Sequence, residues 1–469
     1  MNIIKKLTVG PIVGHADTNH VRIWGRAIYQ PLASNKPRRT FGVARIRKKD
    51  GGSYGAPRVF KMNPNFDMSG VIVFTNLEPN TKYTYQIGWF FSDKEPDEIR
   101  SSEKWDWHDA DRGEFQTASE DPNQAKTFVF GSCRYLLRLL NESWFDDRGD
   151  KTFRSILKQV EEGRALDKFL MVGDQIYADD LNVLAPDKKI EEYLARYRDA
   201  FSQPYLKTLM GNISTYMTLD DHEIEDNWPS SATPKDMTVK FPAAMHSYRI
   251  YQMSHSPLLP ISDTGKLMGT PEKYYYSFLD GCCDFFVTDT RTERDLEQQK
   301  IISDEQMQAL LSWLDNGSER VKFVVTSVPF FPDIKKTNSD KWSGFKQQRD
   351  QIISLIRDRK IPKVVFLGGD VHCSMAAELD ISKPGEDSWK IYSIISSAFF
   401  WPYSHMKASQ FNLTGSVPSL DNENAYSLGK VSQVYSGDNF SRVSVSHEQI
   451  AIEVYERKGE LMHSIQYQF

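Results

Sequence analysis

The chain has 469 residues, and 40% of them are hydrophobic, which allows a substantial core and about two or three domains. Lys and Arg total 58 against 63 Asp and Glu, and the formal net charge of −5 argues against a protein that nucleic acid or anionic lipid attracts by overall charge. No apolar run approaches the roughly 18 to 20 residues of a membrane-spanning helix, so we expect no transmembrane segment.

The cysteine pattern does not predict a disulfide framework, because the four cysteines are unevenly spread and two of them are adjacent. They are Cys133, Cys282, Cys283 and Cys373. Residues 1–14 carry no small-residue cleavage pattern and are a poor export signal. We therefore expect a cytoplasmic protein, unless a leader was removed. The sequence predicts no oligomeric state.

Residues 1–120 contain short alternating apolar runs that turn residues separate. The runs include 21–24, 43–46, 71–74 and 83–87. This spacing of short strands predicts an N-terminal all-β sandwich domain. The turn and tyrosine-bearing strand at 77–85 resemble those of fibronectin type III and immunoglobulin-like domains.

Residues 126–469 follow a different pattern, in which strands alternate with helices. Near-continuous apolar runs are typical of strands covered on both faces, and they lie at 128–130, 169–172, 285–287, 323–325 and 364–367. Helical spacing appears at 153–160 and 190–197, and Ser303 with Gln306 predicts a capping box that opens a third helix. The sequence therefore predicts an α/β domain over 126–469.

Polar motifs follow four of the apolar runs of this second region. They are Gly131-Ser132-Cys133, Gly173-Asp174-Gln175-Ile176-Tyr177, Asp220-Asp221-His222-Glu223 and Gly369-Asp370-Val371-His372. The carboxyl ends of parallel strands share one edge of a sheet, where ligands bind. We therefore expect the four motifs to meet at one site.

The side chains of these motifs are of the kinds that bind metal ions. Thiolate, carboxylate, phenolate and imidazole groups each carry negative charge or offer a lone pair to a cation. Without metal, several carboxylates held together would repel one another and take up protons. A structural zinc site would favour four Cys or His ligands, so iron, manganese, calcium or magnesium fits better than zinc alone.

Taken together, the motifs resemble the PhoD-like alkaline phosphatases of the calcineurin-like metallophosphoesterase superfamily. Besides the four motifs above, the matching pieces are Asn227-Trp228, Asp289-Thr290-Arg291 and Asp340-Lys341-Trp342-Ser343-Gly344-Phe345. They occur in the order of the family and cover nearly the whole chain. The superfamily commonly opens with Asp-x-His and closes with Gly-His-x-His, whereas this chain has Gly-Ser-Cys and Gly-Asp-Val-His, as in the PhoD-like branch.

The resemblance implies a metallophosphoesterase-like α/β sandwich that hydrolyses a small phosphoester. It implies ferric iron and calcium as cofactors, with manganese, magnesium or zinc as alternatives. Cys133 and Tyr177 would hold the ferric ion, Asp174 would be shared between metals, and Asp221 would bind the second metal. Further ligands would be Asp370 and His372.

The expected reaction is attack of metal-bound hydroxide on a phosphate mono- or diester. His222 corresponds to the catalytic histidine of the superfamily, and we expect it to assist the leaving oxygen with a hydrogen bond or proton. Arg134 and Arg291 are candidate phosphate clamps, because a guanidinium group matches two phosphate oxygens at once.

Several alternatives stay open on the sequence alone. The enzyme could prefer lipid, glycerol or nucleotide diesters to monoesters, or the chain could be a non-catalytic binding protein that keeps the fold. Cys133 could be a small buried hydrophobic residue, and Tyr177 could serve packing. Asp220 could orient His222 instead of binding a metal.

Overall fold

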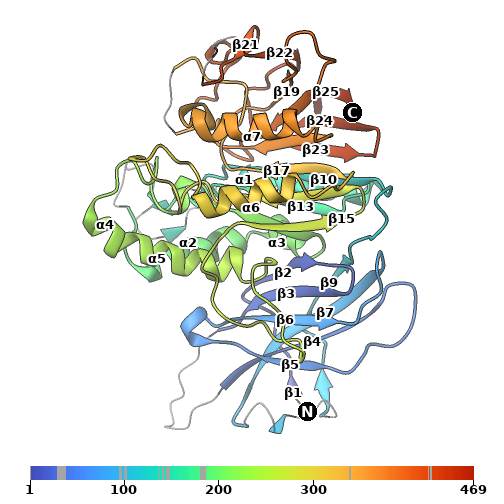
Figure 1. The fold of residues 1–469 in the computed structure, drawn as a ribbon. Coiled ribbons are helices and arrows are strands. Elements are labelled where there is room, and N and C mark those ends of the chain that lie inside the picture. The colour runs from blue at the N-terminus through green and yellow to red at the C-terminus, as the bar shows by residue number, and fades with distance from the viewer. Residues whose placement is uncertain are drawn as a thin grey trace.

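Two mixed β-sheets form the centre of the protein, and a smaller β-sandwich lies beside them (Figure 1). The computed structural model describes residues 2–28, 39–94, 98–99, 103–136, 138–139, 142–143, 148–179, 186–336, 340–420, 422 and 425–469. Within these residues, no helix combines the length and the apolar character that crossing a membrane requires.

The N-terminal strands form the sandwich at the bottom of Figure 1. One sheet has the order β2 (Val9–Ala16), β3 (His20–Arg26), β6 (Ser69–Thr75), and the other has the order β5 (Arg58–Lys61), β4 (Arg39–Lys48), β7 (Lys82–Ser92), β9 (Asp111–Gln116). A short parallel pair joins β1 (Asn2–Ile3) to β8 (Trp105–Asp106). Alternating side chains such as Val21, Ile23, Tyr85 and Ile87 fill the space between the two sheets, as the alternating pattern predicted.

The first central sheet has six strands. Its order is β14 (Ser214–Thr218), β13 (Lys168–Val172), β10 (Lys126–Gly131), β23 (Asn439–Val445), β24 (Gln449–Glu456), β25 (Leu461–Gln468). Strands β10, β13 and β14 are parallel, and the last three strands of the chain continue the sheet in antiparallel fashion.

The second central sheet has eight strands. Its order is β15 (Tyr276–Asp280), β16 (Cys283–Val287), β17 (Val321–Val325), β18 (Val364–Gly368), β20 (Lys390–Ile395), β19 (Met375–Asp380), β22 (Tyr426–Val431), β21 (Ser416–Val417). Strands β16, β17, β18 and β20 are parallel. A hairpin outside both sheets pairs β11 (Arg138–Leu139) with β12 (Glu142–Ser143).

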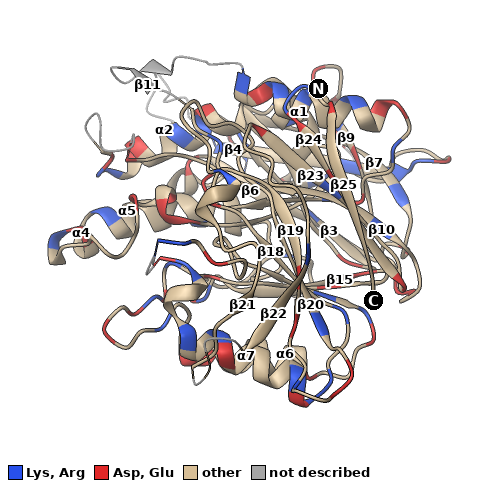
Figure 2. Cartoon of the chain, turned by 90° about the horizontal axis from the view of Figure 1, so that it is seen from above, with Lys and Arg blue, Asp and Glu red and all other residues tan. Residues whose placement is uncertain are grey.

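Helices cover the outer faces of the central sheets (Figure 1). The α-helices are α1 (Arg148–Glu161), α2 (Ile190–Phe201), α3 (Pro204–Met210), α4 (Pro234–Thr238), α5 (Lys240–Tyr248), α6 (Asp304–Leu314) and α7 (Lys346–Asp358). Shorter turns are η1 (Pro64–Phe66), η4 (Asp221–Glu223), η6 (Trp342–Gly344), η7 (Ala408–Gln410) and the π-turn η5 (Arg249–Met253). Lys, Arg, Asp and Glu are interspersed along helices and loops, while the central strands are mostly uncharged (Figure 2).

The two central sheets pack face to face through aromatic side chains. The ring of Phe128 on β10 meets Phe285 on β16 and Phe323 on β17 edge to face, with ring centroids 5.6 and 5.2 Å apart. All three side chains are buried. This rigid core fixes the strand ends that carry the polar motifs.

The sandwich shares part of this core. Trp24 of β3 packs against Tyr251, and the Tyr85 hydroxyl donates a hydrogen bond of 2.6 Å to the carbonyl oxygen of Gly211. The predicted fold class, an α/β metallophosphoesterase-like sandwich with an N-terminal β-sandwich, is confirmed. The division into domains at 1–120 and 126–469 stays a prediction.

The capping box predicted at the third helix is only half formed. Ser303 caps α6 by accepting a hydrogen bond of 3.2 Å from the Gln306 N–H. The Gln306 side chain does not return to Ser303, because its amide binds the Asp289 carbonyl oxygen and the Glu293 carboxylate. Glu293 accepts the Ser303 N–H instead.

A buried ion cluster joins the two central sheets at the end of β15. Asp280 binds Lys126 of β10 at 2.7 Å and also Lys168 of β13. Burial alone would raise the pKa of Asp280, but the attraction of Lys168 and Lys126 outweighs it and lowers the pKa. Asp280 is therefore the close counter-charge of both lysines, and the Asp167 Oδ1 lies farther from the Lys126 Nζ, at 3.8 Å.

We predict that Asp280→Asn lowers the free energy of unfolding by about 3 to 5 kcal/mol, because two buried lysines lose their counter-charge. The control Asp358→Asn removes an exposed ion pair with Arg357 and should cost no more than about 1 kcal/mol. Since the folded-state pKa of Asp280 is depressed, its contribution is complete above the unfolded pKa and disappears as the pH falls through the folded pKa. Urea unfolding at neutral and acidic pH measures both effects, and equal losses in the two variants would contradict the prediction.

Candidate metal centre

The carboxyl ends of four strands bring the predicted ligands together. Cys133 follows β10, Asp174 follows β13, Asp221 lies in η4 after β14, and Asp370 and His372 follow β18. Donor atoms within 4.8 Å of one another form the groups Cys133–Asp174–His372, Asp174–Asp221–His222 and Asp220–Asp221–Asp370. Asp174 belongs to the first two groups and Asp221 to the last two, so the groups form one continuous cluster.

The backbone at this cluster adopts conformations that L-residues rarely take. The φ angle is +56° at Cys133, +55° at Asp174, +69° at Asp370 and +48° at His372. Such left-handed residues each cost roughly 1 to 3 kcal/mol and persist where the surrounding structure holds them. Sharp turns directly after the strands thus aim these side chains at one another.

Glycine is required next to two of the ligands. A Cβ atom on Gly369 would lie 2.4 Å from the Ser132 Oγ, and one on Gly173 would lie 2.6 Å from the Asp220 Cβ. Gly173 also has a φ angle of +107°. Larger residues at either position would push the strand ends apart.

Cys133, Asp174 and Tyr177 form a buried part of the cluster. The thiol of Cys133 donates to the Asp174 Oδ2 at 3.2 Å, and the Tyr177 hydroxyl donates to the same oxygen at 3.3 Å. Burial, together with the neighbouring charge of Asp174, raises the pKa of Cys133, and burial raises the pKa of Tyr177 as well. Thiolate and phenolate forms would therefore need a cation in contact.

Asp220 and Asp221 provide the test of whether a cation fits. The Asp220 Oδ1 binds Arg291 and accepts a hydrogen bond from Ser327, and the Asp221 Oδ2 accepts one of 2.6 Å from the Asn227 N–H. Among the described residues, their other oxygens, Asp220 Oδ2 and Asp221 Oδ1, are buried and accept no hydrogen bond. Buried carboxylate oxygens without donors, beside a thiol and imidazoles, fit a bound multivalent cation.

His222 lies in the same cluster and is held by a carboxylate. Its Nδ1 lies 2.8 Å from the Asp179 Oδ2, and its Nε2 lies 3.8 Å from the Asp226 Oδ1. Burial alone would lower the pKa of His222, but the charges of Asp221, Asp174 and Asp179 raise it well above the usual value. The ring is thus held through Nδ1 and favours the protonated form.

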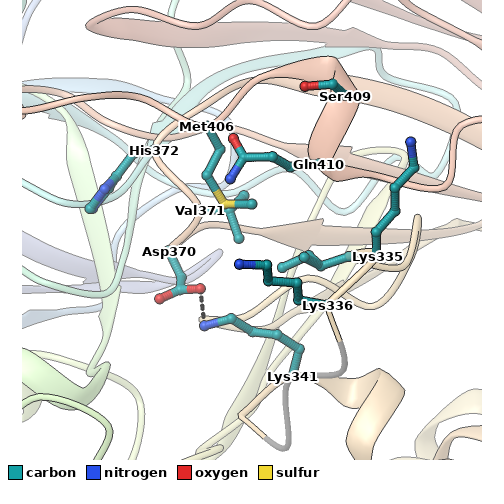
Figure 3. A pocket seen from close by; sticks show the side chains of 10 residues that line it. Lys335, Lys336, Lys341, Asp370, Val371, His372, Met406, Ser409 and Gln410 are labelled. Carbon is teal, nitrogen blue, oxygen red and sulfur yellow. Dashed lines mark ion pairs between the residues drawn. The ribbon is translucent and has the colours of Figure 1, made fainter.

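Asp370 and His372 border the cluster on its other side. Lys341 forms an ion pair with Asp370, which the dashed line in Figure 3 marks, and it binds Asp340 at 2.8 Å. Burial raises the pKa of Asp370 to about 7, although Lys341 opposes the shift. The His372 ring stacks on Trp401 with ring centroids 3.9 Å apart, and burial lowers the pKa of His372, so the ring is neutral as a metal ligand requires.

A cavity of about 240 Å³ opens over this cluster. Five predicted site residues line it, namely Asp174, Asp221, His222, Asp370 and His372. The lining also includes Asp226 and Asn227, for which the sequence predicted no role, and Trp401, whose aromatic cluster at 399–403 the sequence left open between a substrate cleft and packing or an interface. Asn227 belongs to the Asn227-Trp228 motif, which could have identified it as a site residue.

The sequence also missed two charged residues at the edge of the site. Lys341 stands in a motif that carried the family resemblance and Asp179 follows another by two residues, but neither was assigned a role. Burial would lower the pKa of Lys341, yet Asp340 and Asp370 raise it well above the usual value, so the ammonium stays charged. Both residues act on predicted site residues, Lys341 on Asp370 and Asp179 on His222.

The two arginines predicted as phosphate clamps do not line the cavity. The Arg134 guanidinium is buried and donates to the Ala200 carbonyl oxygen at 2.7 Å and to Gln203 at 3.3 Å. Arg291 is fully buried and binds the carboxylates of Asp220 and Asp340. Because protein groups already occupy both guanidinium groups, the structure does not support the clamp roles, and we assign neither residue a phosphate contact.

Comparisons with known proteins agree with the geometry. The sequence model of the family described as PhoD-like phosphatase matches residues 141–432, which is more than half of the chain. The curated protein alkaline phosphatase D of Bacillus subtilis (strain 168) is 24% identical over 215 residues, which make up 41% of this chain and 36% of the length of that relative. The chain therefore matches well under two thirds of that relative.

Solved structures share the fold. A structure described as that of PhoD has a TM-score of 0.71 at 18% identity and covers 98% of this chain and 89% of its own. A purple acid phosphatase from yellow lupin (Lupinus luteus) seeds has a TM-score of 0.59 at 12% identity, with 98% and 74% of the chains covered. With the family match over more than half of its residues, the chain belongs to the PhoD-like phosphatase family.

Proposed function

We propose that the chain is a metal-dependent phosphoester hydrolase. The observation that carries this proposal is the continuous cluster in which Asp174 shares donor groups with Cys133 on one side and Asp221 on the other. Family membership and the fold of two phosphatase structures support it. A non-catalytic binding protein would not need an open cavity over so costly a cluster of buried charges.

The proposed ligands form two sets that share Asp174. Cys133 and Tyr177 belong to the first set, Asp221 and Asp370 to the second, and His372 lies within reach of Cys133 and Asp174. By family resemblance the cations are ferric iron and calcium, with manganese, magnesium or zinc as alternatives. Bound cations would neutralise the phosphate, polarise its oxygens and lower the pKa of water.

Side chains of the protein position His222 and line the cavity in which the substrate would bind. Asp179 holds the Nδ1 of His222, which leaves the Nε2 as the nitrogen that can donate a hydrogen bond or proton to the departing oxygen. The Asp226 Oδ1 lies 3.8 Å from this nitrogen. Asn227 and Trp401 line the cavity, where an amide can donate to a phosphate oxygen and an indole can exclude water.

The proposal covers both phosphate monoesters and phosphate diesters as substrates. Hydrolysis of p-nitrophenyl phosphate and bis(p-nitrophenyl) phosphate by the metal-loaded protein tests it directly. Turnover of either ester supports the function, and a much higher rate of hydrolysis for the bis ester than for the monoester would identify a phosphodiesterase. Absence of turnover for both esters, with metal bound, would refute the hydrolase proposal.

We predict that Asp174→Asn loses metal from both ligand sets, whereas Cys133→Ala loses about one equivalent. Both variants should lose activity, because each removes an anionic ligand that other buried groups cannot replace. Cys373→Ala is the matched control, since Cys373 is a buried free cysteine in an apolar cluster. Mass spectrometry of metal content, with circular dichroism as a folding check, distinguishes the variants, and full metal content in Cys133→Ala would contradict the ligand assignment.

We predict that His222→Ala keeps its metal but loses about 100- to 10,000-fold in kcat. The loss should be larger for an alkyl phosphate than for p-nitrophenyl phosphate, because a poor leaving group depends more on protonation. Asp179→Asn should show a smaller loss with the same substrate dependence, since it acts by positioning the ring.

His108→Ala provides the control for these variants, because His108 also lies beside a carboxylate, that of Asp109, but is exposed on the surface. It should keep wild-type kcat with both substrates. An equal loss of His222→Ala on alkyl and aryl esters would exclude the leaving-group role.

A further inference from the structure

A larger pocket of about 600 Å³ adjoins the metal cavity (Figure 3). Asp370 and His372 line both spaces, so the two lie side by side. Three segments form the wall, namely 334–336, 370–372 and 406–410. A phosphoester whose phosphate occupies the metal cavity therefore has room to extend one substituent into this pocket.

The pocket combines apolar walls with polar groups at defined positions. Ile334, Val371 and Met406 provide the apolar surface. In Figure 3 the ammonium group of Lys336 points inward, toward Asp370 and Val371, whereas that of Lys335 points away. An organic group can thus lie on the apolar wall while Lys336 reaches its far end.

Of the three lysines that line the pocket, Lys336 is the one whose ammonium group points toward Asp370 without an ion pair to a described carboxylate. Lys341 also lines the pocket, but Asp340 and Asp370 already bind its ammonium group. No described residue forms an ion pair or hydrogen bond with the side chain of Lys336. Because Lys341 and Asp370 neutralise each other, Lys336 gives the pocket a positive charge beside Asp370, and Lys335 adds a second positive charge on the same wall.

Gln410 adds a second donor on the same side. Its Oε1 accepts a hydrogen bond of 2.8 Å from the Lys407 N–H, which fixes the amide and leaves its NH₂ group to donate elsewhere. Figure 3 shows this amide group directed toward Val371. An ammonium and an amide NH₂ group facing one space suit a carboxylate or a phosphate.

We propose that this pocket binds the organic group esterified to the substrate phosphate and selects a group that carries its own negative charge. The inference rests on the proposed hydrolase function and names the substrate class, a phosphoester with a carboxylate or second phosphate on its leaving group. Lys336 determines this specificity and takes no part in the chemical step.

The test uses two substrates of one shape that differ in charge, 3-carboxyphenyl phosphate and 3-carbamoylphenyl phosphate. Wild type should show a higher kcat/KM for the carboxylate, and Lys336→Gln should lower that value about threefold to tenfold while leaving the amide substrate unchanged. The comparison between wild type and variant cancels the intrinsic difference between the two leaving groups. Raised ionic strength should reduce the wild-type preference.

Lys346→Gln is the matched control, because it removes the same charge from an exposed lysine of α7 that does not line the pocket. It should keep the wild-type preference, and Lys336→Glu should reverse that preference. Equal effects of Lys346→Gln and Lys336→Gln would show a general surface charge and overturn the subsite.

The two proposals fail in distinguishable ways. If metal-loaded wild type hydrolyses neither the two substrates nor the methyl diesters of the same phenols, the hydrolase function fails. If it hydrolyses both substrates and Lys336→Gln changes neither rate, the subsite alone fails and the hydrolase function stands.

Discussion

Concentrated negative charge in a buried place is the constraint on which the rest of this structure depends. Asp221 has a carboxylate oxygen within 4.8 Å of one of Asp174 in one group and of one of Asp220 in another, and all three buried side chains lose hydration there. Burial and mutual repulsion act to protonate them, as the raised pKa of Asp174 shows. Arg291 compensates Asp220 and helps to hold the pKa of Asp221 below its usual range, against the effect of burial. The Asp221 Oδ1 lies 3.5 Å from the Arg291 Nη2 but accepts no hydrogen bond from a described residue, and the Asp220 Oδ2 accepts none either, so a bound cation would complete their compensation.

The rigid fold holds these mutually repelling groups together. Interlocked aromatic rings such as Phe128, Phe285 and Phe323 fix the two sheets, and sharp turns at the strand ends leave the ligands no alternative conformation. Strained backbone at Cys133 and Asp174 would relax if the strands could separate. A loosely packed scaffold would therefore lose the site before it lost the fold.

The sequence predicted those features that local patterns determine. Buried parallel strands must be apolar on both faces, so runs such as 169–172 identify both the strand and its polar end. The sequence did not predict where the side chains of Arg134 and Arg291 point, because the direction of a long side chain depends on partners that lie far along the chain. Asp340 is 49 residues from Arg291, and no sequence pattern near Arg291 predicts that the two form an ion pair. The pocket beside the metal centre was equally hidden, since its walls come from separate loops.

Asp370 connects the metal centre to that pocket. Its carboxylate faces both spaces, and by itself it would repel a negatively charged substituent. Lys341 removes this repulsion by pairing with it, as Figure 3 shows. Lys341 is in turn anchored by Asp340, which Arg291 and Arg294 also bind. The buried arginine that the sequence assigned to phosphate thus acts at a distance, because it stabilises the carboxylate that positions Lys341 and so permits the pocket to accept an anion.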